Sequence, residues 1–422
     1  MGITSALYSG VSGLNTNSQA MSVIGNNLAN TNTVGFKGAR TVFSDLLSAS
    51  ITGSGGRSQV GRGTSMSIVD NIYSQGTFET TESGLDVAIE GQGFFMLKQP
   101  GDNTAYYSRA GAFRFDENGY LVSPEGMRVQ GQPYDTAGNL IPGDPTDIYV
   151  STAGLIKGRA TTAVTMNTNL DSGERLIDPA NFDVADTSTY NYSSSTQVYD
   201  SLGNPHLLTT YFIKTDQNQW QWRWSADVNG TVQTGVGGEL YFTPEGILTD
   251  TYGSTTPSAA SITGAVPAVD WQNGTTPTDI TMTFNTTQFN SASMVISQDQ
   301  DGFSAGELTG ININSDGAVV ASYSNGEQIK VSNLVLARFT NPNGLESAGS
   351  NTYIATSESG SPRIGLPGPE LGKVFTNSLE MSNVDMGSEF VRMITTQRGF
   401  QANSKIITTV DDMLSDLINL KR

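Results

Sequence analysis

Apolar residues at both ends of the chain recur with the spacing of an α-helix. The first 30 residues carry no charged side chain, and positions 3, 7, 10, 14, 17, 21, 24 and 28 form a heptad seam interrupted only by Gly10 and Asn17. A second seam steps by four and three from Ile406 to Leu420 and is widened by neighbouring apolar residues. We therefore predict one helix at each end of the chain.

These two helices are the candidate interaction surface. A helix that lacks charge is expected to be covered on several sides, so we predict that both helices form an interface with a partner. The ordinary alternative is a pair of core helices in a soluble protein. The predicted polymerisation interface consists of Ile3, Leu7, Leu14, Met21, Ile24, Leu28, Phe390, Met393, Ile406, Val410, Met413, Leu417 and Leu420.

Local signals bound the helices. Asparagines and Gly35 within residues 26–37 are residue types that end helices, because they tolerate left-handed backbone conformations. Residues Ser382 to Asp385 are interpreted as a capping box at the start of the second helix, with Glu389 in an early turn. Residues 48–65 are rich in Gly and Ser and predict a flexible or extended connector without secondary structure.

From about residue 72 the pattern becomes that of short antiparallel strands. Residues 85–89 alternate, residues 94–97 form a buried run, and Asn118-Gly119 is a hairpin signal. The same pattern returns at residues 311–339, with turns at Asp316-Gly317 and Asn325-Gly326. These two distant segments are predicted to form one β-domain.

The region between those segments is predicted to be a separate insertion. It contains all four tryptophans, of which Trp220, Trp222 and Trp224 alternate onto one face of a strand. Such a stripe favours a β-domain core over a carbohydrate-binding platform.

The predicted fold is therefore α+β and mainly β, in a nested multidomain chain. The N- and C-terminal helices pair in a coiled-coil-like inner domain, and two antiparallel β-domains lie outside it. The expected domains are a helical polymerisation domain (1–30 and 385–422), an extended connector (31–71 and 366–384), an inner β-domain (72–145 and 301–365) and an outer β-domain (146–300).

Composition narrows the function classes. A net charge of −18 argues against nucleic acid, whose phosphates require a basic face. With no cysteine and only His206, thiolate and histidine-cluster metal sites have almost no ligands. Asp299, Asp301 and Glu307 do not have the spacing of an EF-hand. We expect no enzyme activity, no catalytic residue, no cofactor and no metal, and we expect neither a Sec-type signal nor a membrane span at the N-terminus.

Four stretches closely resemble the bacterial flagellar rod and hook family of axial proteins: residues 26–37, 84–95, 378–385 and 397–405. Residues 301–308 and 323–326 are similar to a further β-domain segment of its hook members. The length of the chain and its central insertion favour a hook member over the shorter distal-rod members. The residues that carry the family motif are Asn26, Asn27, Leu28, Ala29, Asn30, Gly35, Phe36, Lys37, Ser382, Asn383, Val384, Asp385, Gln397 and Arg398.

The resemblance implies an extracellular, tubular homopolymer that bends as a universal joint while it transmits motor torque to the filament. It also implies export through the flagellar type III apparatus. The implied partners are other copies of the chain, a hook cap scaffold, a hook-filament junction protein, the distal rod and a hook-length control protein. The alternatives are a distal-rod-type axial protein and a secreted glycan-binding adhesin that uses the central β-domain.

Overall fold

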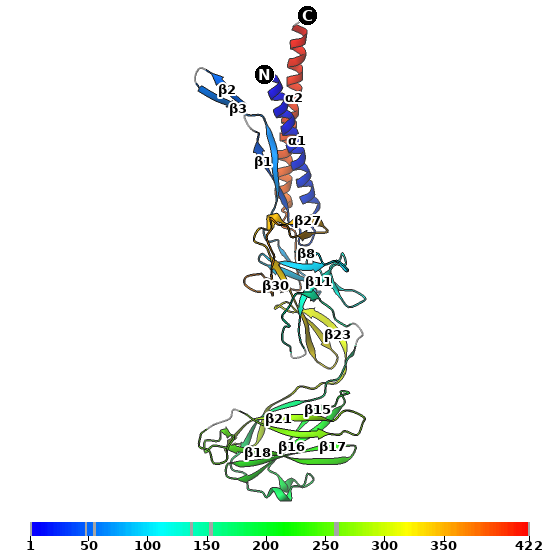
Figure 1. The fold of residues 1–422 in the computed structure, drawn as a ribbon, viewed down its shortest axis with the longest axis vertical. Helices are drawn as coiled ribbons and strands as arrows, with labels where there is room; N and C mark the ends of the chain where they lie inside the picture. The colour runs from blue at the N-terminus through cyan, green and yellow to red at the C-terminus, as the bar shows by residue number, and fades with distance from the viewer. Residues whose placement is uncertain are drawn as a thin grey trace. The chain divides into compact units, whose positions relative to one another are not determined.

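The computed structural model describes residues 2–46, 49–53, 56–135, 138–151, 155–256 and 261–420 (Figure 1). The chain forms two compact units. Unit 1 comprises Met1–Thr152, Ile311–Ala321 and Ile329–Arg422, and unit 2 comprises Ala153–Gly310 and Ser322–Gln328. Among the described helices, none has the length and apolar character needed to cross a membrane.

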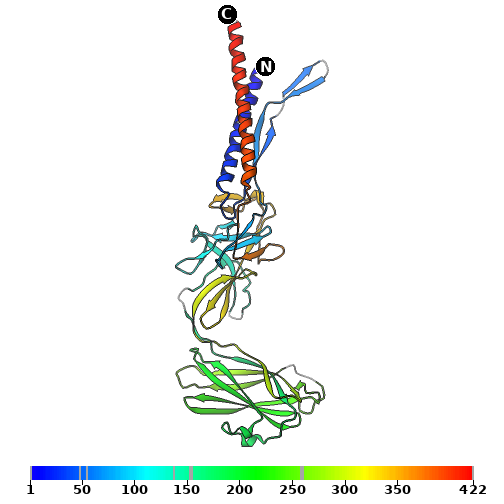
Figure 2. The ribbon, with the colours of Figure 1, turned by 180° about the vertical axis from the view of Figure 1, so that it is seen from behind.

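Unit 1 begins and ends with a long helix, as the sequence predicts. Helices α1 (Gly2–Ala29) and α2 (Met386–Leu420) lie side by side and antiparallel (Figure 2). Glycines set their separation, because a Cβ atom at Gly13 would lie 2.6 Å from the Asn403 side chain and one at Gly10 would lie 3.1 Å from Ile407. The helices are therefore closest where small residues face the partner helix.

The predicted capping box is wrong in detail. The N-cap of α2 is Asp385, whose Oδ1 accepts a hydrogen bond of 2.7 Å from the Ser388 N–H. The Ser382 hydroxyl instead accepts a bond from the Val384 N–H, outside the helix. Asp385 is selected because it immediately precedes the first helical residue, where a side-chain oxygen reaches an unpaired N–H.

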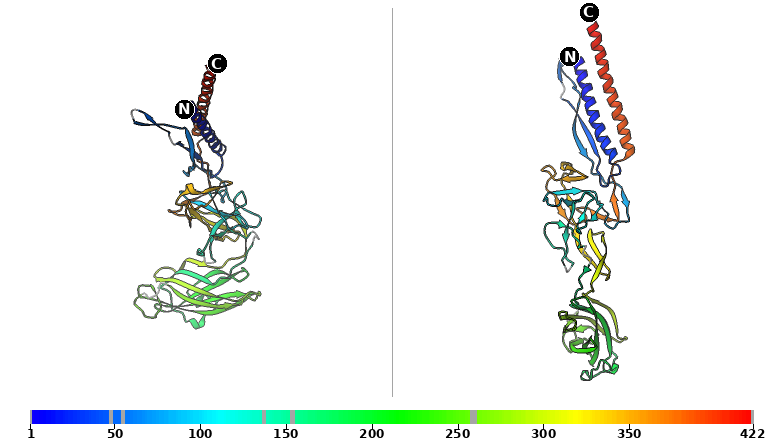
Figure 3. Two further views of the ribbon diagram at one scale, coloured as in Figure 1. Left: turned by 45° about the horizontal axis from the view of Figure 1, so that its top comes forward. Right: turned by 90° about the vertical axis from the view of Figure 1, so that its right-hand side faces the viewer.

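The predicted connector at residues 48–65 is also wrong in part, because strands occupy much of it. Strands β1 (Ala39–Asp45) and β4 (Thr64–Asn71) pair antiparallel, and β2 (Ala49–Gly53) pairs with β3 (Gly56–Val60). Of these strands, β1 and β4 contact α1, and the blue ribbon of this region lies next to that helix in the right-hand view of Figure 3. Strands that are close in sequence pair at a low loop-closure cost, so a Gly- and Ser-rich composition does not exclude a hairpin.

The β-domain of unit 1 is an antiparallel sheet that brings distant segments together. Its central path runs β25-β11-β7-β8-β28-β27. Separate two-stranded pairs join β5 to β31 and β6 to β30. The strands are β5 (Phe78–Thr80), β6 (Val87–Glu90), β7 (Phe94–Lys98), β8 (Ala105–Ser108), β9 (Arg114–Phe115), β10 (Leu121–Val122), β11 (Arg128–Pro133), β12 (Thr146–Asp147), β25 (Gln328–Leu334), β26 (Leu336–Arg338), β27 (Glu346–Gly349), β28 (Thr352–Ile354), β29 (Arg363–Gly365), β30 (Lys373–Thr376) and β31 (Ser378–Glu380), with a 3-10 turn at η3 (Pro342–Gly344).

The hairpin predictions are confirmed. Gly119 joins β9 to β10, Gly317 joins β23 (Gly306–Ile313) to β24 (Ala318–Tyr323), and Gly326 joins β24 to β25. Their φ angles lie between +79° and +88°, the region that glycine adopts without strain. The alternation predicted at residues 85–89 is wrong, because Val87, Ala88 and Ile89 are all fully buried. Both faces of β6 are covered, so both carry apolar residues.

Unit 2 contains two further sheets around one core. One sheet has the order β15-β16-β17-β18-β19 and the other β20-β21-β14-β22, in which β14 and β21 are parallel. The strands are β13 (Leu155–Ile156), β14 (Ala163–Asp171), β15 (Tyr192–Tyr199), β16 (Pro205–Asp216), β17 (Gln219–Val228), β18 (Thr231–Phe242), β19 (Leu248–Thr249), β20 (Ile262–Val269), β21 (Thr278–Phe289) and β22 (Met294–Gln300), with 3-10 turns at η1 (Pro179–Asn181) and η2 (Thr187–Thr189).

The tryptophan stripe is the core of unit 2. All four tryptophans are buried in a single apolar cluster, in which Trp220 and Trp222 are at most 1% exposed. Glycines on neighbouring strands make room for the indoles, since a Cβ atom at Gly237 would lie 2.2 Å from the Trp222 ring and one at Gly264 would lie 2.3 Å from it. The prediction of a β-domain core is confirmed for this stripe.

We predict that Gly237→Ala destabilises unit 2 by about 1–3 kcal/mol, because the added methyl group overpacks the site against Trp222. Denaturant unfolding followed by tryptophan fluorescence measures the effect, because all four tryptophans lie in this core. Gly310→Ala is the matched control, since a Cβ atom at that strand position meets no atom within 4 Å. Equal denaturant midpoints for Gly237→Ala and Gly310→Ala would contradict the packing of Gly237 against Trp222.

Candidate functional site

The buried stripe of α1 shares Gly10 and Ile24 with the predicted seam but is shifted by one residue at its other positions. The buried residues of α1 are small or polar at most positions: Gly10, Gly13, Thr16, Ala20, Ile24 and Asn27. The large residues of the predicted seam flank this stripe, because small residues allow closer approach of the two backbones. Most of the large apolar side chains of α1 therefore remain partly exposed.

The structure separates the predicted interface residues into three groups. Ile24 and Val410 are buried. Leu7, Leu14, Met21, Leu28 and Met393 are half-buried, whereas Phe390, Ile406 and Met413 are 42%, 43% and 55% exposed. The side chains of Ile3, Leu417 and Leu420 lie outside the described residues.

Other apolar side chains on the same helices are exposed as well. The predicted interface does not include them, although Leu414 and Ile418 are among the neighbours that widen the second seam. These are Tyr8 and Val11 on α1 and Met386, Val391, Ile394, Phe400, Leu414 and Ile418 on α2. A heptad template selects one stripe and therefore misses them, although apolar residues around the whole helix are a signal of contacts on several sides. Together with Phe390, Ile406 and Met413, they form what we call the exposed helix surface.

Two asparagines of the family motif join the helices to the strands. The buried Asn27 side chain accepts a bond from the Ala39 N–H and donates to the Ala39 carbonyl, at 2.9 and 2.7 Å, and it also lies 3.4 Å from the Glu389 carboxylate of α2. The Asn383 side chain accepts from the Gly38 N–H at 2.8 Å and donates to the Ile72 carbonyl at 2.7 Å. Each side-chain amide thus forms hydrogen bonds with backbone groups of segments that are distant in the sequence.

A buried ion cluster lies at the same junction. Glu380 Oε1 is 2.5 Å from Lys37 Nζ, and Glu380 Oε2 is 3.3 Å from Arg109 Nη1. The three side chains, here called the ionic triad, are at most 2% exposed. They come from the segment after α1, the β-domain and the last strand before α2. Because buried charges are tolerated only when paired, the triad forces these three segments to meet.

Backbone groups complete the ionic triad. Lys37 Nζ donates to the Ser74 carbonyl at 2.8 Å, the Gly76 N–H donates to Glu380 Oε1 at 2.9 Å, and Arg109 Nη2 donates to the Gly91 carbonyl at 2.6 Å. Burial lowers the pKa of Lys37 and of Arg109, and the negative charge of Glu380 offsets part of each shift. The triad contains two basic groups and one acidic group.

The other motif residues shape the turn around the triad or lie on α2. Gly35 has a φ of +68°, and its N–H donates to the Glu380 carbonyl at 2.6 Å. A Cβ atom at Gly35 would lie 2.5 Å from the Ala110 nitrogen, so glycine is required there. The Asn30 side chain donates to the Asn26 carbonyl, and the Phe36 carbonyl accepts from the Asn383 N–H. Ala29, Gln397 and Arg398 are exposed, and Val384 is half-buried.

Unit 2 gives no support to the alternative sites considered from the sequence. A carbohydrate platform on the tryptophan stripe is wrong, since Trp224, the most exposed of the four, is 6% exposed. The Asp301 carboxylate accepts bonds from the N–H groups of Thr162 and Ala163, from the Thr162 hydroxyl and from Arg159. His206 stacks on Trp271 and lies 3.1 Å from the Asp200 carboxylate. Each group has a structural partner.

Family comparisons cover most of the chain. Residues 7–37 match the family described as "Flagella basal body rod protein", and residues 376–420 match "Flagellar basal body rod FlgEFG protein C-terminal". Residues 88–158 match "Flagellar hook protein FlgE/F/G D1 domain", and residues 169–303 match "Flagellar basal body protein FlaE D2 domain". The matches at the two ends coincide with the helices and the junction described above.

Full-length relatives give the same result. The chain is 35% identical to the flagellar hook protein FlgE of Salmonella typhimurium, over 97% of this chain and 98% of that protein. It is 36% identical to the flagellar hook proteins FlgE of Escherichia coli K12 and of Borreliella burgdorferi, over at least 99% of each chain. The crystal structure of the Helicobacter pylori flagellar hook protein FlgE2 aligns with a TM-score of 0.51 at 15% identity, covering 72% of this chain and 100% of that one. This last similarity shows a related fold.

We predict that Glu380→Gln destabilises unit 1 by about 3–5 kcal/mol, because it leaves two buried cations without their counter-ion. Helical circular dichroism during denaturant unfolding follows unit 1, which contains both α1 and α2. Tryptophan fluorescence, which reports on unit 2, should keep its midpoint. Glu79→Gln is the control, since Glu79 is an exposed carboxylate on β5, directly opposite Leu379 of β31. A Glu380→Gln midpoint equal to that of Glu79→Gln would show that the triad is not needed.

Proposed function

The chain belongs to the flagellar hook protein family, and we propose that its two end helices polymerise it into a tube. It is a structural subunit of the flagellar hook, in the extracellular part of the flagellum. The exposed helix surface of α1 and α2 is the observation that supports this proposal. A concentration of exposed large apolar side chains on one pair of helices is typical of an interaction site.

Copies of the same chain are the partner that explains this surface best. A helix pair that exposes apolar residues on several sides can contact several neighbours at once. Contacts between different faces of identical subunits are heterologous, and when they do not close into a ring they produce a helical polymer. The residues predicted from the sequence, from Leu7 to Leu28 and from Phe390 to Met413, belong to the proposed interface.

The ionic triad would connect that polymerising surface to the β-domain. Force applied to the helices would pass through the paired backbone groups around Asn27, Asn383 and Glu380. We propose that the tube acts as a universal joint, bending while it transmits motor torque. We also retain as a proposal the four-part division into residues 1–30 with 385–422, 31–71 with 366–384, 72–145 with 301–365, and 146–300.

The proposed partners beyond the chain itself follow from its place in the flagellum. They are the hook cap scaffold, the hook-filament junction protein, the distal rod, the hook-length control protein and the type III export apparatus. We propose a purely structural role, without enzyme activity.

The two alternatives have less support. A distal-rod-type protein is disfavoured because the cited full-length relatives are named hook proteins. A glycan-binding adhesin is disfavoured because the tryptophan stripe that suggested it is buried in the core of unit 2.

We predict that Phe390→Gln and Met413→Gln each raise the critical concentration for tube formation about ten- to a hundredfold. Each replaces an exposed apolar side chain of α2 whose burial in the tube is worth about 1.5–3 kcal/mol. Glutamine has nearly the same helix propensity as methionine, so thermal unfolding of the Met413→Gln monomer should change little. Sedimentation and electron microscopy over a concentration series measure assembly.

Leu176→Gln is the matched control for this experiment. Leu176 is 58% exposed but belongs to unit 2, which contains neither helix. We expect the critical concentration of Leu176→Gln to stay near that of the unchanged chain. If both α2 variants formed tubes as readily as the control, the exposed helix surface would not be the polymerisation interface.

A further inference from the structure

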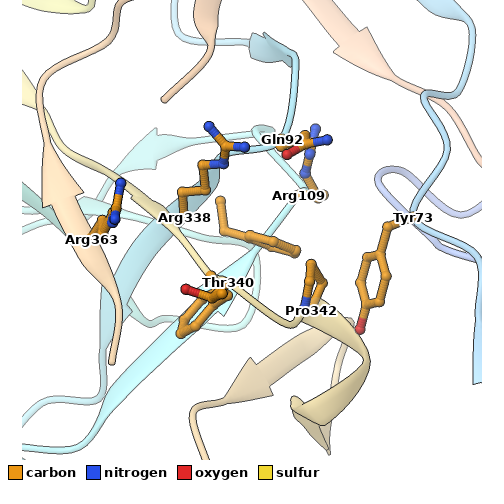
Figure 4. Close-up of a pocket in the computed structure, with 9 residues that line it drawn as sticks. Tyr73, Gln92, Arg109, Arg338, Thr340, Pro342 and Arg363 are labelled. Atoms are coloured by element: carbon orange, nitrogen blue, oxygen red, sulfur yellow. The ribbon is translucent and has the colours of Figure 1, made fainter. Parts of the chain in front are cut away.

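Unit 1 contains a pocket of about 410 Å³ that is lined by three arginines and by aromatic side chains (Figure 4). The arginines are Arg109, Arg338 and Arg363, and the aromatic residues are Tyr73, Phe94 and Phe339. None of the residues that line it is acidic. This concentration of positive charge is unusual in a chain with 40 acidic and 22 basic residues.

Two of the arginines lie directly opposite each other on paired strands. Arg338 of β26 is the cross-strand partner of Arg363 of β29, and the neighbouring residues of β26 are held by β7. Like charges in opposite positions destabilise a strand pair. Within the described residues neither guanidinium forms an ion pair, and Arg338 Nη1 donates only to the Glu370 carbonyl, at 3.0 Å.

The third arginine is a member of the ionic triad. Arg109 is 2% exposed, and its Nε has no hydrogen-bond partner among the described residues. Glu380 is shared between Lys37 and Arg109, so this buried cluster keeps one uncompensated positive charge. An anion in the pocket would compensate the excess positive charge beside it and would also relieve the repulsion between Arg338 and Arg363.

We infer that this pocket receives a carboxylate side chain from a neighbouring subunit of the polymer. The guanidinium groups supply paired N–H donors of the geometry that a carboxylate accepts. The aromatic rings place apolar surface beside the guanidinium groups, which strengthens the pairing. Because the chain has a net charge of −18, every neighbouring copy presents many carboxylates. The inference rests on the proposed polymer, in which the neighbour is a second copy of this chain.

The first test is the effect of Arg363→Glu on the monomer and on the tube. In the monomer the variant converts a like-charge cross-strand pair into an attractive one, so its unfolding temperature should stay equal or rise. In the tube it places a negative charge against the incoming carboxylate, so the critical concentration should rise about tenfold or more. Arg114→Glu is the control, because Arg114 is an exposed arginine on β9 of the same β-domain.

The second test identifies the carboxylate. Arg338→Lys places an amine in the pocket, and a zero-length carbodiimide reagent joins amines to carboxylates that touch them. In tubes, peptide mapping should find Lys at position 338 linked to an acidic residue of another subunit, and the link should be absent from monomers. A linkage only to Glu90 or Glu370 of the same subunit would overturn the inference.

The remaining outcomes separate this inference from the proposed function. If the unchanged chain formed tubes and Arg363→Glu assembled equally well, the inference would be wrong and the polymer would stand. Acetate binding to monomers, measured by calorimetry and lost in Arg363→Glu while assembly stayed normal, would assign the pocket to a free anion instead. If the unchanged chain formed no tubes at any concentration, both proposals would be overturned.

Discussion

The sharing of one buried carboxylate by two buried cations is the constraint on which the arrangement of unit 1 depends. Glu380 pairs with Lys37, which follows α1, and with Arg109 of the β-domain, and it lies just before α2. A buried ion without its partner costs several kcal/mol, so the three segments have no stable alternative arrangement that separates them. Asn27 and Asn383 then fix the strands β1 and β4 to the same junction. Both helices therefore leave the β-domain from one position.

The helices that leave this junction complete only part of their packing within one chain. Glycines at positions 10 and 13 bring α1 close to α2, and the larger side chains are left beside or outside the contact. Burial of a large apolar side chain contributes about 1.5–3 kcal/mol, so the proposed covering of the exposed helix surface by other subunits would add a substantial stabilisation. The single chain thus keeps this surface available, while the buried ions hold the helices in place.

Much of this structure follows from local sequence signals. The terminal helices, the three Gly-containing hairpin turns and the tryptophan core depend on residues near each other in sequence, and their periodicity predicts them. Heptad analysis gives most weight to large residues and therefore did not single out Gly13, although Gly10 and Gly13 face α2 and allow its close approach. The ionic triad could not be predicted, because Lys37, Arg109 and Glu380 are separated by long stretches of chain and meet only after folding. The strands within residues 49–60 were missed because composition does not reveal a pairing partner.

The most direct test of the account is hydroxyl-radical footprinting of the exposed helix surface in monomers and in tubes. Met413, Phe400 and Tyr8 are 55%, 43% and 70% exposed in the single chain and react readily with the radical. Met282, which is fully buried in unit 2, reports whether the fold stays intact. The account predicts strong protection of the three helix residues in tubes and no labelling of Met282 in either state. Equal labelling of the helix residues in monomers and tubes would contradict polymerisation through α1 and α2.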